Sequence, residues 1–217
     1  LMNISQINLV HFLHESFVID QEFSNYLQQL FENIILFKKL YEIKQHEGES
    51  SFLFYFGVLY MNGYGLYFKP NYQKAKTYFE KSAKLNNILA FYNLGVLYEK
   101  GLIGKPDYTK AKKYYEVASQ NNFPLGITSL GNLYVNGQGV DKNYNRAREL
   151  YEKAAQLNDS MALYNLGLLY EEGFGVDKSL LKAKEYYDLS AEFDNDLALY
   201  RLGHLYLEGI GVKKDYL

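Results

Sequence analysis

The sequence predicts an all-α fold in which antiparallel helix pairs stack into a solenoid. The main observation is a set of residue columns that return every 36–38 positions along most of the chain. The columns are Gly57, Gly95, Gly131, Gly167 and Gly203; Leu59, Leu97, Leu133, Leu169 and Leu205; Tyr60, Tyr98, Tyr134, Tyr170 and Tyr206; Gly63, Gly101, Gly137, Gly173 and Gly209; and Ala75, Ala111, Ala147 and Ala183. A second observation is the scarcity of proline, with only 3 in 217 residues, which permits helices almost everywhere.

Each repeat is predicted to consist of a helix A, a glycine-containing loop and a helix B. At 100° per residue, one side of the second helix A collects Ala90, Phe91, Leu94, Leu97 and Tyr98, which we expect to face the core. Gly95 lies at the edge of this side. Because glycine has no side chain, we expect another helix to approach closely there.

Helix B is predicted to combine small residues for close approach with aromatic residues that fill the remaining space. In the second repeat this face carries Ala111, Tyr114, Tyr115 and Ala118. Loop glycines such as Gly137 are expected to end helix A with a positive φ. Helix B is expected to end at residues that tolerate the left-handed conformation, namely Asn86, Asn122, Asn158 and Asp194.

The two ends of the chain depart from the regular repeat. Leu40-Tyr41-Glu42 matches Leu150-Tyr151-Glu152, so residues 36–48 are predicted to be helix B of a degenerate repeat. We expect a helix from about Asp20 to His46, preceded by one short helix in the first eighteen residues. This divides the chain into an N-terminal helical cap, 1–49, and a region of four full repeats and one truncated repeat, 50–217. Because the pattern stops where helix B should begin, we expect the native protein to continue beyond Leu217.

The repeat pattern A-x-x-x-L-G-x-L-Y-x-x-G-x-G-V-x-x-x-Y-x-x-A-x-x-Y-Y-E-x-A-A resembles the Sel-one-like repeat (SLR) family, which is related to tetratricopeptide repeats. The resemblance covers residues 50–217. It implies a right-handed superhelix whose helix A residues line the concave side, and a role as an adaptor that holds protein partners. Three departures concern local geometry: the second loop reads Gly101-Leu102-Ile103-Gly104, Gly126 replaces an alanine, and Leu180 replaces a tyrosine.

Composition argues against several functional classes. Lys plus Arg is 23 and Asp plus Glu is 25, so the net charge is 23 − 25 = −2, without the basic excess of a dedicated nucleic-acid binder. The absence of cysteine removes disulfides, thiolate metal sites and thiol nucleophiles. No apolar run approaches the ~20 residues that a membrane-spanning helix needs.

Candidate sites for chemistry are weak. The Gly-x-Gly loops follow helices and recur with the repeat, whereas a phosphate-binding loop requires a preceding strand, so we interpret them as turns. His11 and His14 lie three residues apart beside Glu15, but no third ligand follows at a recognisable spacing. No nucleophile, base and orienting acid can be assembled. We therefore expect no metal, no cofactor and no enzymatic activity.

The concave face is the remaining candidate site. The residue types on this face differ between repeats, whereas those of the core columns stay the same. The predicted partner-binding residues are Tyr92, Asn93, Val96, Asn132, Tyr164, Asn165, Leu168, Tyr200, Arg201 and His204, and the same helices also place Glu99, Lys100, Thr128, Ser129 and Glu171 there. Amides can pair with the backbone of an extended peptide, and tyrosines supply contact area with a polar end. The alternative is an ordinary solvated surface, on which the residue differences between repeats do not reflect binding.

The sequence therefore favours a protein–protein interaction scaffold that binds a peptide or protein in this groove, with a partner that is neutral to slightly basic. One alternative is a regulatory or spacer region of a larger protein whose enzyme, such as a kinase or ubiquitin-ligase-associated unit, lies outside this segment. Another is a helical-repeat RNA reader. The mixed, faintly acidic groove argues against that alternative.

Overall fold

The computed structural model describes residues 32, 35–36, 38–64 and 68–209, and it confirms the all-α fold. In these ranges the secondary structure is helical apart from turns and one isolated antiparallel bridge between Tyr64 and Phe68. Several expectations lie outside the described residues. These are the first short helix, residues 20–31 of the long N-terminal helix, the pair His11 and His14, and the segment 210–217.

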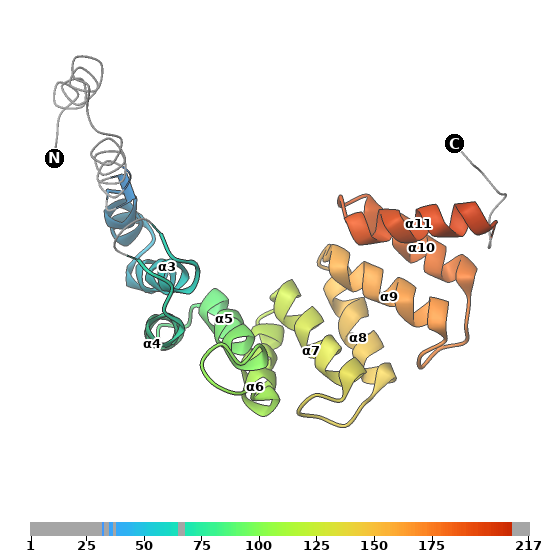
Figure 1. The fold of residues 1–217 in the computed structure, drawn as a ribbon, viewed down its shortest axis with the longest axis horizontal. Coiled ribbons are helices and arrows are strands. Elements are labelled where there is room, and N and C mark those ends of the chain that lie inside the picture. The colour runs from blue at the N-terminus through green and yellow to red at the C-terminus, as the bar shows by residue number, and fades with distance from the viewer. Residues whose placement is uncertain (1–31, 33–34, 37, 65–67, 210–217) are drawn as a thin grey trace, which may run out of the picture. The chain divides into compact units, whose positions relative to one another are not determined.

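The helices alternate between the first and second members of each pair, as the repeat predicts (Figure 1). The first helices are α3 (Glu49–Asn62), α5 (Ile88–Glu99), α7 (Pro124–Asn136), α9 (Ser160–Glu172) and α11 (Asp196–Glu208). The second helices are α4 (Tyr72–Ala83), α6 (Tyr108–Gln120), α8 (Tyr144–Ala155) and α10 (Leu180–Ala191).

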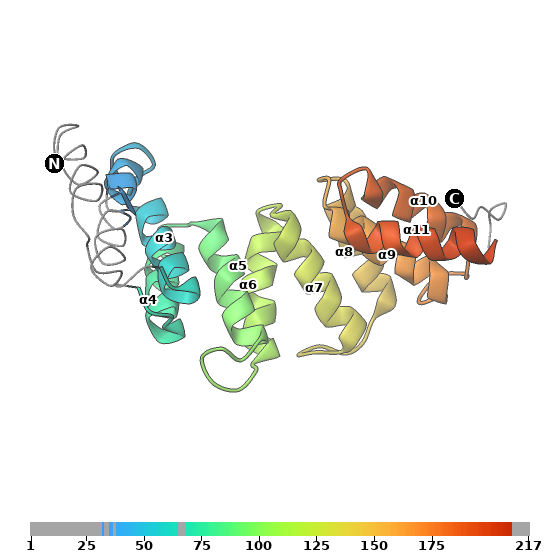
Figure 2. The same ribbon diagram turned by 45° about the horizontal axis from the view of Figure 1, so that its top comes forward.

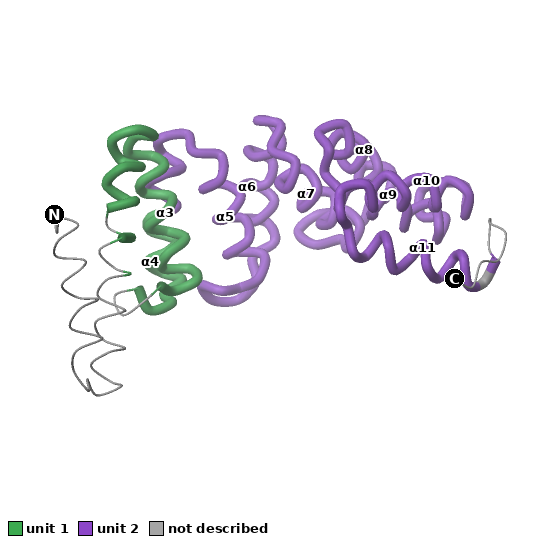
Figure 3. Tube along the Cα trace, turned by 90° about the horizontal axis from the view of Figure 1, so that it is seen from above, with its two compact units in different colours: residues 1–78 green, residues 79–217 purple. Residues whose placement is uncertain are grey.

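The chain divides into two compact units, 1–78 and 79–217, and the boundary falls within α4 (Figure 3). The first unit contains α3 and an aromatic cluster. Its Tyr60 and Tyr78 rings are stacked 5.5 Å apart, and Phe56 meets Phe68 edge-on at 5.7 Å. Residues 38–46 are helical, as expected for the cap. We retain the division into a cap and repeats at residue 49 as a proposal.

Within the second unit, each second helix packs against the first helix of its own pair and against the first helix of the next pair (Figure 2). Thus α6 lies against α5 and α7, α8 against α7 and α9, and α10 against α9 and α11. The core between them contains the leucine and alanine columns and other residues of the predicted core faces, whereas the column tyrosines Tyr98, Tyr134 and Tyr170 are partly exposed. The buried residues include Ala90, Leu94, Leu97, Ala111, Tyr115, Ala118, Leu133, Ala147, Tyr151, Leu166, Leu169, Ala183 and Tyr187. The repeat periodicity therefore identified the buried side of both helices.

The glycine column allows close approach, and the partner that approaches is a tyrosine ring. A Cβ added to Gly95 would lie 2.4 Å from the ring of Tyr115. The same addition at Gly167 would lie 2.3 Å from the ring of Tyr187. Both distances are far shorter than van der Waals contact, so glycine is required wherever a second-helix tyrosine lies across the first helix. The departure at Gly126 has a similar cause, because an added Cβ would meet the Cβ of Ala118 at 2.4 Å.

The predicted helix ends are confirmed. The second helices are followed by four residues with positive φ: Asn86 at 61°, Asn122 at 54°, Asn158 at 61° and Asp194 at 55°. Helices α7, α9 and α11 end at left-handed glycines, Gly137, Gly173 and Gly209, whose φ values are 68°, 76° and 65°. These backbone conformations turn the chain between successive helices.

The second glycine of the loops has a packing role in the third and fourth repeats. An added Cβ at Gly139 would lie 2.7 Å from the carbonyl carbon of Tyr108, at the start of α6. At Gly175 it would lie 2.8 Å from the Cβ of Tyr144, at the start of α8. Each loop therefore packs on the preceding second helix. The second loop differs, because a Cβ on Gly104 would meet nothing within 4 Å.

Candidate functional site

The ten predicted partner-binding residues all lie on first helices of the second unit, and we call them the A face. None of them is buried: Tyr200 is 72% exposed, His204 is also exposed, and the other eight are partly exposed. Of the further residues expected there, Thr128 is buried, so its inclusion was wrong. The structure brings several A-face residues into contact across neighbouring repeats.

Tyr92 connects α5 to α7. Its ring lies 5.4 Å from that of Phe123 and 5.9 Å from that of Tyr115, measured between ring centroids. Burial raises the pKa of Tyr92, and the influence of the Ser129 hydroxyl partly offsets this effect. Tyr92 is therefore fixed between repeats, with only part of its surface open to a partner.

Asn132 and Asn165 meet between α7 and α9. The Asn165 amide nitrogen donates to Asn132 Oδ1 at 3.2 Å, and the Tyr151 hydroxyl donates to the same oxygen at 2.6 Å. Within the described ranges, the Asn132 amide group and the Asn165 side-chain oxygen form no other hydrogen bond. One donor group and one acceptor group therefore remain for a partner.

Arg201 connects α11 to α9. Its Nη1 lies 3.3 Å from Glu171 Oε1. The Tyr164 side chain, followed by the charge of Glu171, raises the pKa of Arg201. Glu171 additionally accepts a hydrogen bond from the Tyr187 hydroxyl. Burial, together with this bond, raises the pKa of Tyr187. The positive charge of Arg201 is thus largely balanced by Glu171.

Sequence reasoning treated the second-helix tyrosines as core fillers and missed the role of their hydroxyls. The Tyr115 hydroxyl donates to Glu99 Oε2 at 2.6 Å, as Tyr187 does to Glu171. Both glutamates stand four residues after the column glycine. The first repeat carries Phe79 at the tyrosine position and Met61 at the glutamate position, so the hydroxyl and its acceptor are absent together. That paired change is a signal that could have identified the interaction from the sequence.

Among the described residues, Asn93, Val96, Leu168 and Tyr200 form no hydrogen bond or ion pair with another A-face residue. Asn93 donates its amide to the carbonyl of Leu89 on its own helix at 2.8 Å. Val96 and Leu168 pack against the adjacent core clusters. Tyr200 and His204 stand exposed on α11. The A face thus combines amides, tyrosines, one paired arginine and apolar contacts, which suits hydrogen bonding and packing with a polypeptide.

Among the described residues, no three His, Cys, Asp or Glu side chains are grouped closely enough to hold a metal ion. In the same part of the chain, none of the helices combines the length and the apolar character needed to cross a bilayer.

Comparison with known families identifies the repeat. The family model described as Sel1 repeat matches residues 52–87, 89–123, 124–159, 160–192 and 196–217. These five matches follow the repeat columns along the chain. A search of the curated proteins found no match.

Solved structures show the same fold. A Sel1 repeat protein from Oxalobacter formigenes is 31% identical, with a TM-score of 0.72, over 77% of this chain and 67% of that chain. The protein c5321, a protective antigen present in uropathogenic Escherichia coli strains and displaying an SLR fold, is 30% identical with a TM-score of 0.65. This similarity covers 80% of the present chain but only 37% of c5321. Immunity protein Pa5087 from Pseudomonas aeruginosa is 24% identical, over 76% of this chain and 61% of that one, and its TM-score of 0.57 supports the fold alone.

Proposed function

The chain belongs to the Sel1 repeat family, and from this premise we propose that its A face binds a peptide segment or a protein surface without chemistry of its own. Sel1 repeat proteins are generally scaffolds for protein–protein interaction and are typically not catalytic. The proposal adds the location of the binding surface and the kind of group that would bind there.

The observation that supports this proposal is the unused hydrogen-bonding capacity along the A face. Asn132 retains an amide donor and Asn165 an acceptor after their mutual bond. These two groups lie on neighbouring first helices, so an extended peptide that crosses from α7 to α9 could satisfy both with its backbone. Tyr200, with 72% of its surface exposed, adds contact area at the α11 end.

The charges favour a partner that is neutral to slightly basic. Glu171 is already balanced by Arg201 at 3.3 Å. Glu99 accepts the Tyr115 hydroxyl, but no ion pair involving Glu99 occurs among the described residues. A lysine or arginine of a partner that binds near α5 would form an ion pair with this carboxylate.

The test compares proteins captured by the wild-type chain with those captured by an Asn93→Ala, Tyr200→Ala double variant. These two side chains do not bond to other A-face residues, so their removal leaves the contacts between repeats intact. The matched control is Leu181→Ser, which changes an exposed position, 60% open to solvent, on the second helix α10. Captured proteins are quantified by mass spectrometry and confirmed by titration with the purified partner.

We expect the partner to bind the wild type and the Leu181→Ser control alike, and the double variant about tenfold more weakly or worse. Equal affinity for all three proteins would contradict binding at the A face. Loss of binding only in the Leu181→Ser control would assign the contact to the second helices instead.

A further inference from the structure

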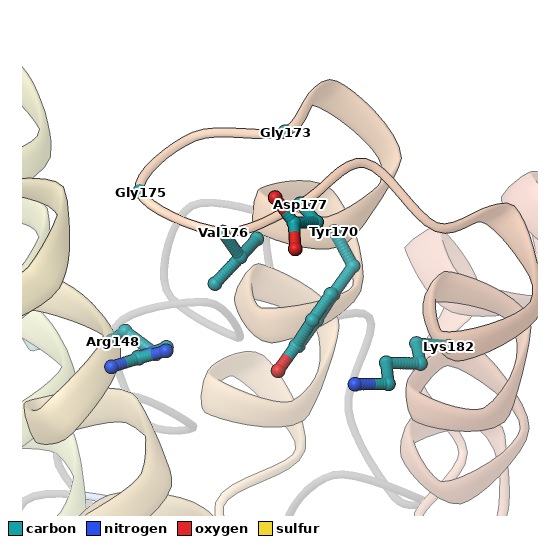
Figure 4. A pocket seen from close by; sticks show the side chains of 7 residues that line it. All are labelled: Arg148, Tyr170, Gly173, Gly175, Val176, Asp177 and Lys182. Atoms are coloured by element: carbon teal, nitrogen blue, oxygen red, sulfur yellow. The ribbon is translucent and has the colours of Figure 1, made fainter.

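A hollow of about 580 Å³ lies in the second unit where α8, α9 and α10 meet, and it shares no residue with the A face (Figure 4). The lining residues are Arg148, Tyr170, Gly173, Gly175, Val176, Asp177 and Lys182. Arg148 comes from α8, Tyr170 from α9 and Lys182 from α10, and the loop after α9 supplies the rest. The hollow is thus built by two consecutive repeats.

Three hydrogen-bond donors of this hollow form no hydrogen bond with the protein within the described ranges. Arg148 Nε is buried and makes no hydrogen bond. The Tyr170 hydroxyl makes no hydrogen bond either, and Figure 4 shows it pointing between the side chains of Arg148 and Lys182. The Lys182 ammonium lies 5.1 Å from the centroid of the Tyr170 ring and forms no ion pair. A buried donor without an acceptor is costly, so the arrangement suits an acceptor from outside the protein.

The neighbouring repeats provide an internal comparison for Arg148. The residues one repeat before and after it are Lys112 and Lys184. Lys112 lies 2.7 Å from Glu116, and Lys184 lies 2.6 Å from Asp188. In contrast, Arg148 Nε lies 3.7 Å from Glu152, beyond hydrogen-bond distance. Its charge is therefore less completely balanced than that of its equivalents.

The same comparison distinguishes Lys182. Its equivalents in the two preceding repeats are paired, Lys110 with Asp107 at 3.1 Å and Arg146 with Glu149 at 2.5 Å. Where Asp107 caps α6, the neutral Ser179 caps α10, so Lys182 has no carboxylate at that position. The hollow thus holds two cations that are less completely paired than their equivalents: Lys182 forms no ion pair within the described ranges, and Arg148 Nε lies 3.7 Å from Glu152.

We propose that this hollow binds the phosphate group of a phosphate monoester. A guanidinium, an ammonium and a hydroxyl approach from three helices and can serve separate oxygens of a dianion. Gly173 and Gly175 add no side chains to the part of the loop that lines the hollow. Asp177, at the edge of the loop, is the one acidic residue of the lining and offsets only part of the positive charge of Arg148 and Lys182. The hollow is larger than a phosphate and has room for part of the group that carries it.

The experiment titrates the 217-residue chain with inorganic phosphate at constant ionic strength and follows backbone amide resonances by NMR. We expect saturable shifts confined to the loop of Gly173, Gly175 and Val176. Arg148→Gln and Lys182→Gln should each raise the phosphate Kd by about tenfold or more, because each removes one charge-assisted contact. The matched control is Lys112→Gln, the Arg148 position one repeat earlier, and it should leave the Kd unchanged.

A second arm replaces inorganic phosphate with O-phosphoserine and with acetate. Tighter or equal binding of O-phosphoserine supports the assignment to a monoester, and its failure to bind would overturn it. Tighter binding of acetate than of phosphate would overturn the phosphate assignment in favour of a carboxylate. Loop shifts that saturate with an unchanged Kd in the Lys182→Gln variant, whose side chain is exposed, would overturn the site itself.

Discussion

The hydroxyl of Tyr115 donates to Oε2 of Glu99 at 2.6 Å, which joins the second helix of a repeat to its first helix. The Tyr115 ring is fully buried, and it lies against Gly95 on that same first helix. One tyrosine therefore requires two features of its partner helix, a missing side chain at one position and an acceptor four residues later. The Tyr187, Gly167 and Glu171 set repeats this arrangement.

Tyr115→Phe should lower the free energy of unfolding by about 1–3 kcal/mol, because it leaves the Glu99 carboxylate without its buried donor. Adding Glu99→Met recreates the combination that the first repeat has at Phe79 and Met61. We expect the double variant to regain part of the loss. Urea unfolding of the wild type, both single variants and the double variant gives the coupling energy. A coupling energy near zero would show that the two side chains act independently.

Gly167→Ala should be strongly destabilising, by about 2 kcal/mol or more, because its Cβ would lie 2.3 Å from the Tyr187 ring. The matched control is Gly203→Ala in the same column, where an added Cβ meets nothing within 4 Å. There alanine should be neutral or stabilising by up to about 1 kcal/mol, since it favours the helix. Thermal unfolding of both variants checks the opposite signs, and an equal loss in both would refute the steric explanation.

The fold was predictable from the sequence because the columns encode packing between neighbours. Gly95, Leu97 and Ala111 mark the buried sides of two helices, and repetition of the pattern removes ambiguity about helix type and length. Asn122 and its equivalents mark the turns, since few residue types tolerate a φ near 54°. Burial and turns of this kind depend only on contacts within one repeat and with the next, so the sequence of two repeats is enough to predict them.

The candidate site was less predictable, because helical angles give the direction of a side chain but not its partner. Asn132 and Asn165 were both placed on the A face, yet their mutual hydrogen bond depends on the distance between α7 and α9. The burial of Thr128 has a similar origin, because it depends on how closely α7 approaches its neighbours. Such distances are set by the packing of helices against one another, and the sequence pattern of a single helix does not give them.

Asn122→Val should destabilise the protein by about 1–2 kcal/mol, because a β-branched residue is strained at its φ of 54°. Asn122→Gly is the matched control and should cost little, since glycine adopts this conformation without a steric penalty. Asn122 is exposed, so neither substitution removes core contacts. Chemical denaturation measures both variants. If Asn122→Gly is as damaging as Asn122→Val, the side chain of Asn122 matters for a reason other than backbone conformation.

Alkaline pH should destabilise the protein through its buried tyrosines. Burial raises the pKa of Tyr115, Tyr151 and Tyr187 above the usual 10.0, and the bonds to Glu99 and Glu171 reinforce this for two of them. The folded chain then keeps protons that the unfolded chain releases. The stabilisation is complete below about pH 10 and is lost as the pH rises towards the folded pKa, by about 1.4 kcal/mol per pH unit for each tyrosine.

Urea unfolding at about pH 8 and about pH 11 measures this loss. Lys112 and Lys184, whose pKa values are raised by hydrogen bonds to Glu116 and Asp188, lose stabilising charge over the same pH range. Tyr151→Phe separates the two causes, because it removes a buried tyrosine whose acceptor, Asn132, carries no charge. This variant should lose less stability between the two pH values than the wild type. An identical loss would show that Tyr151 does not contribute to the alkaline sensitivity.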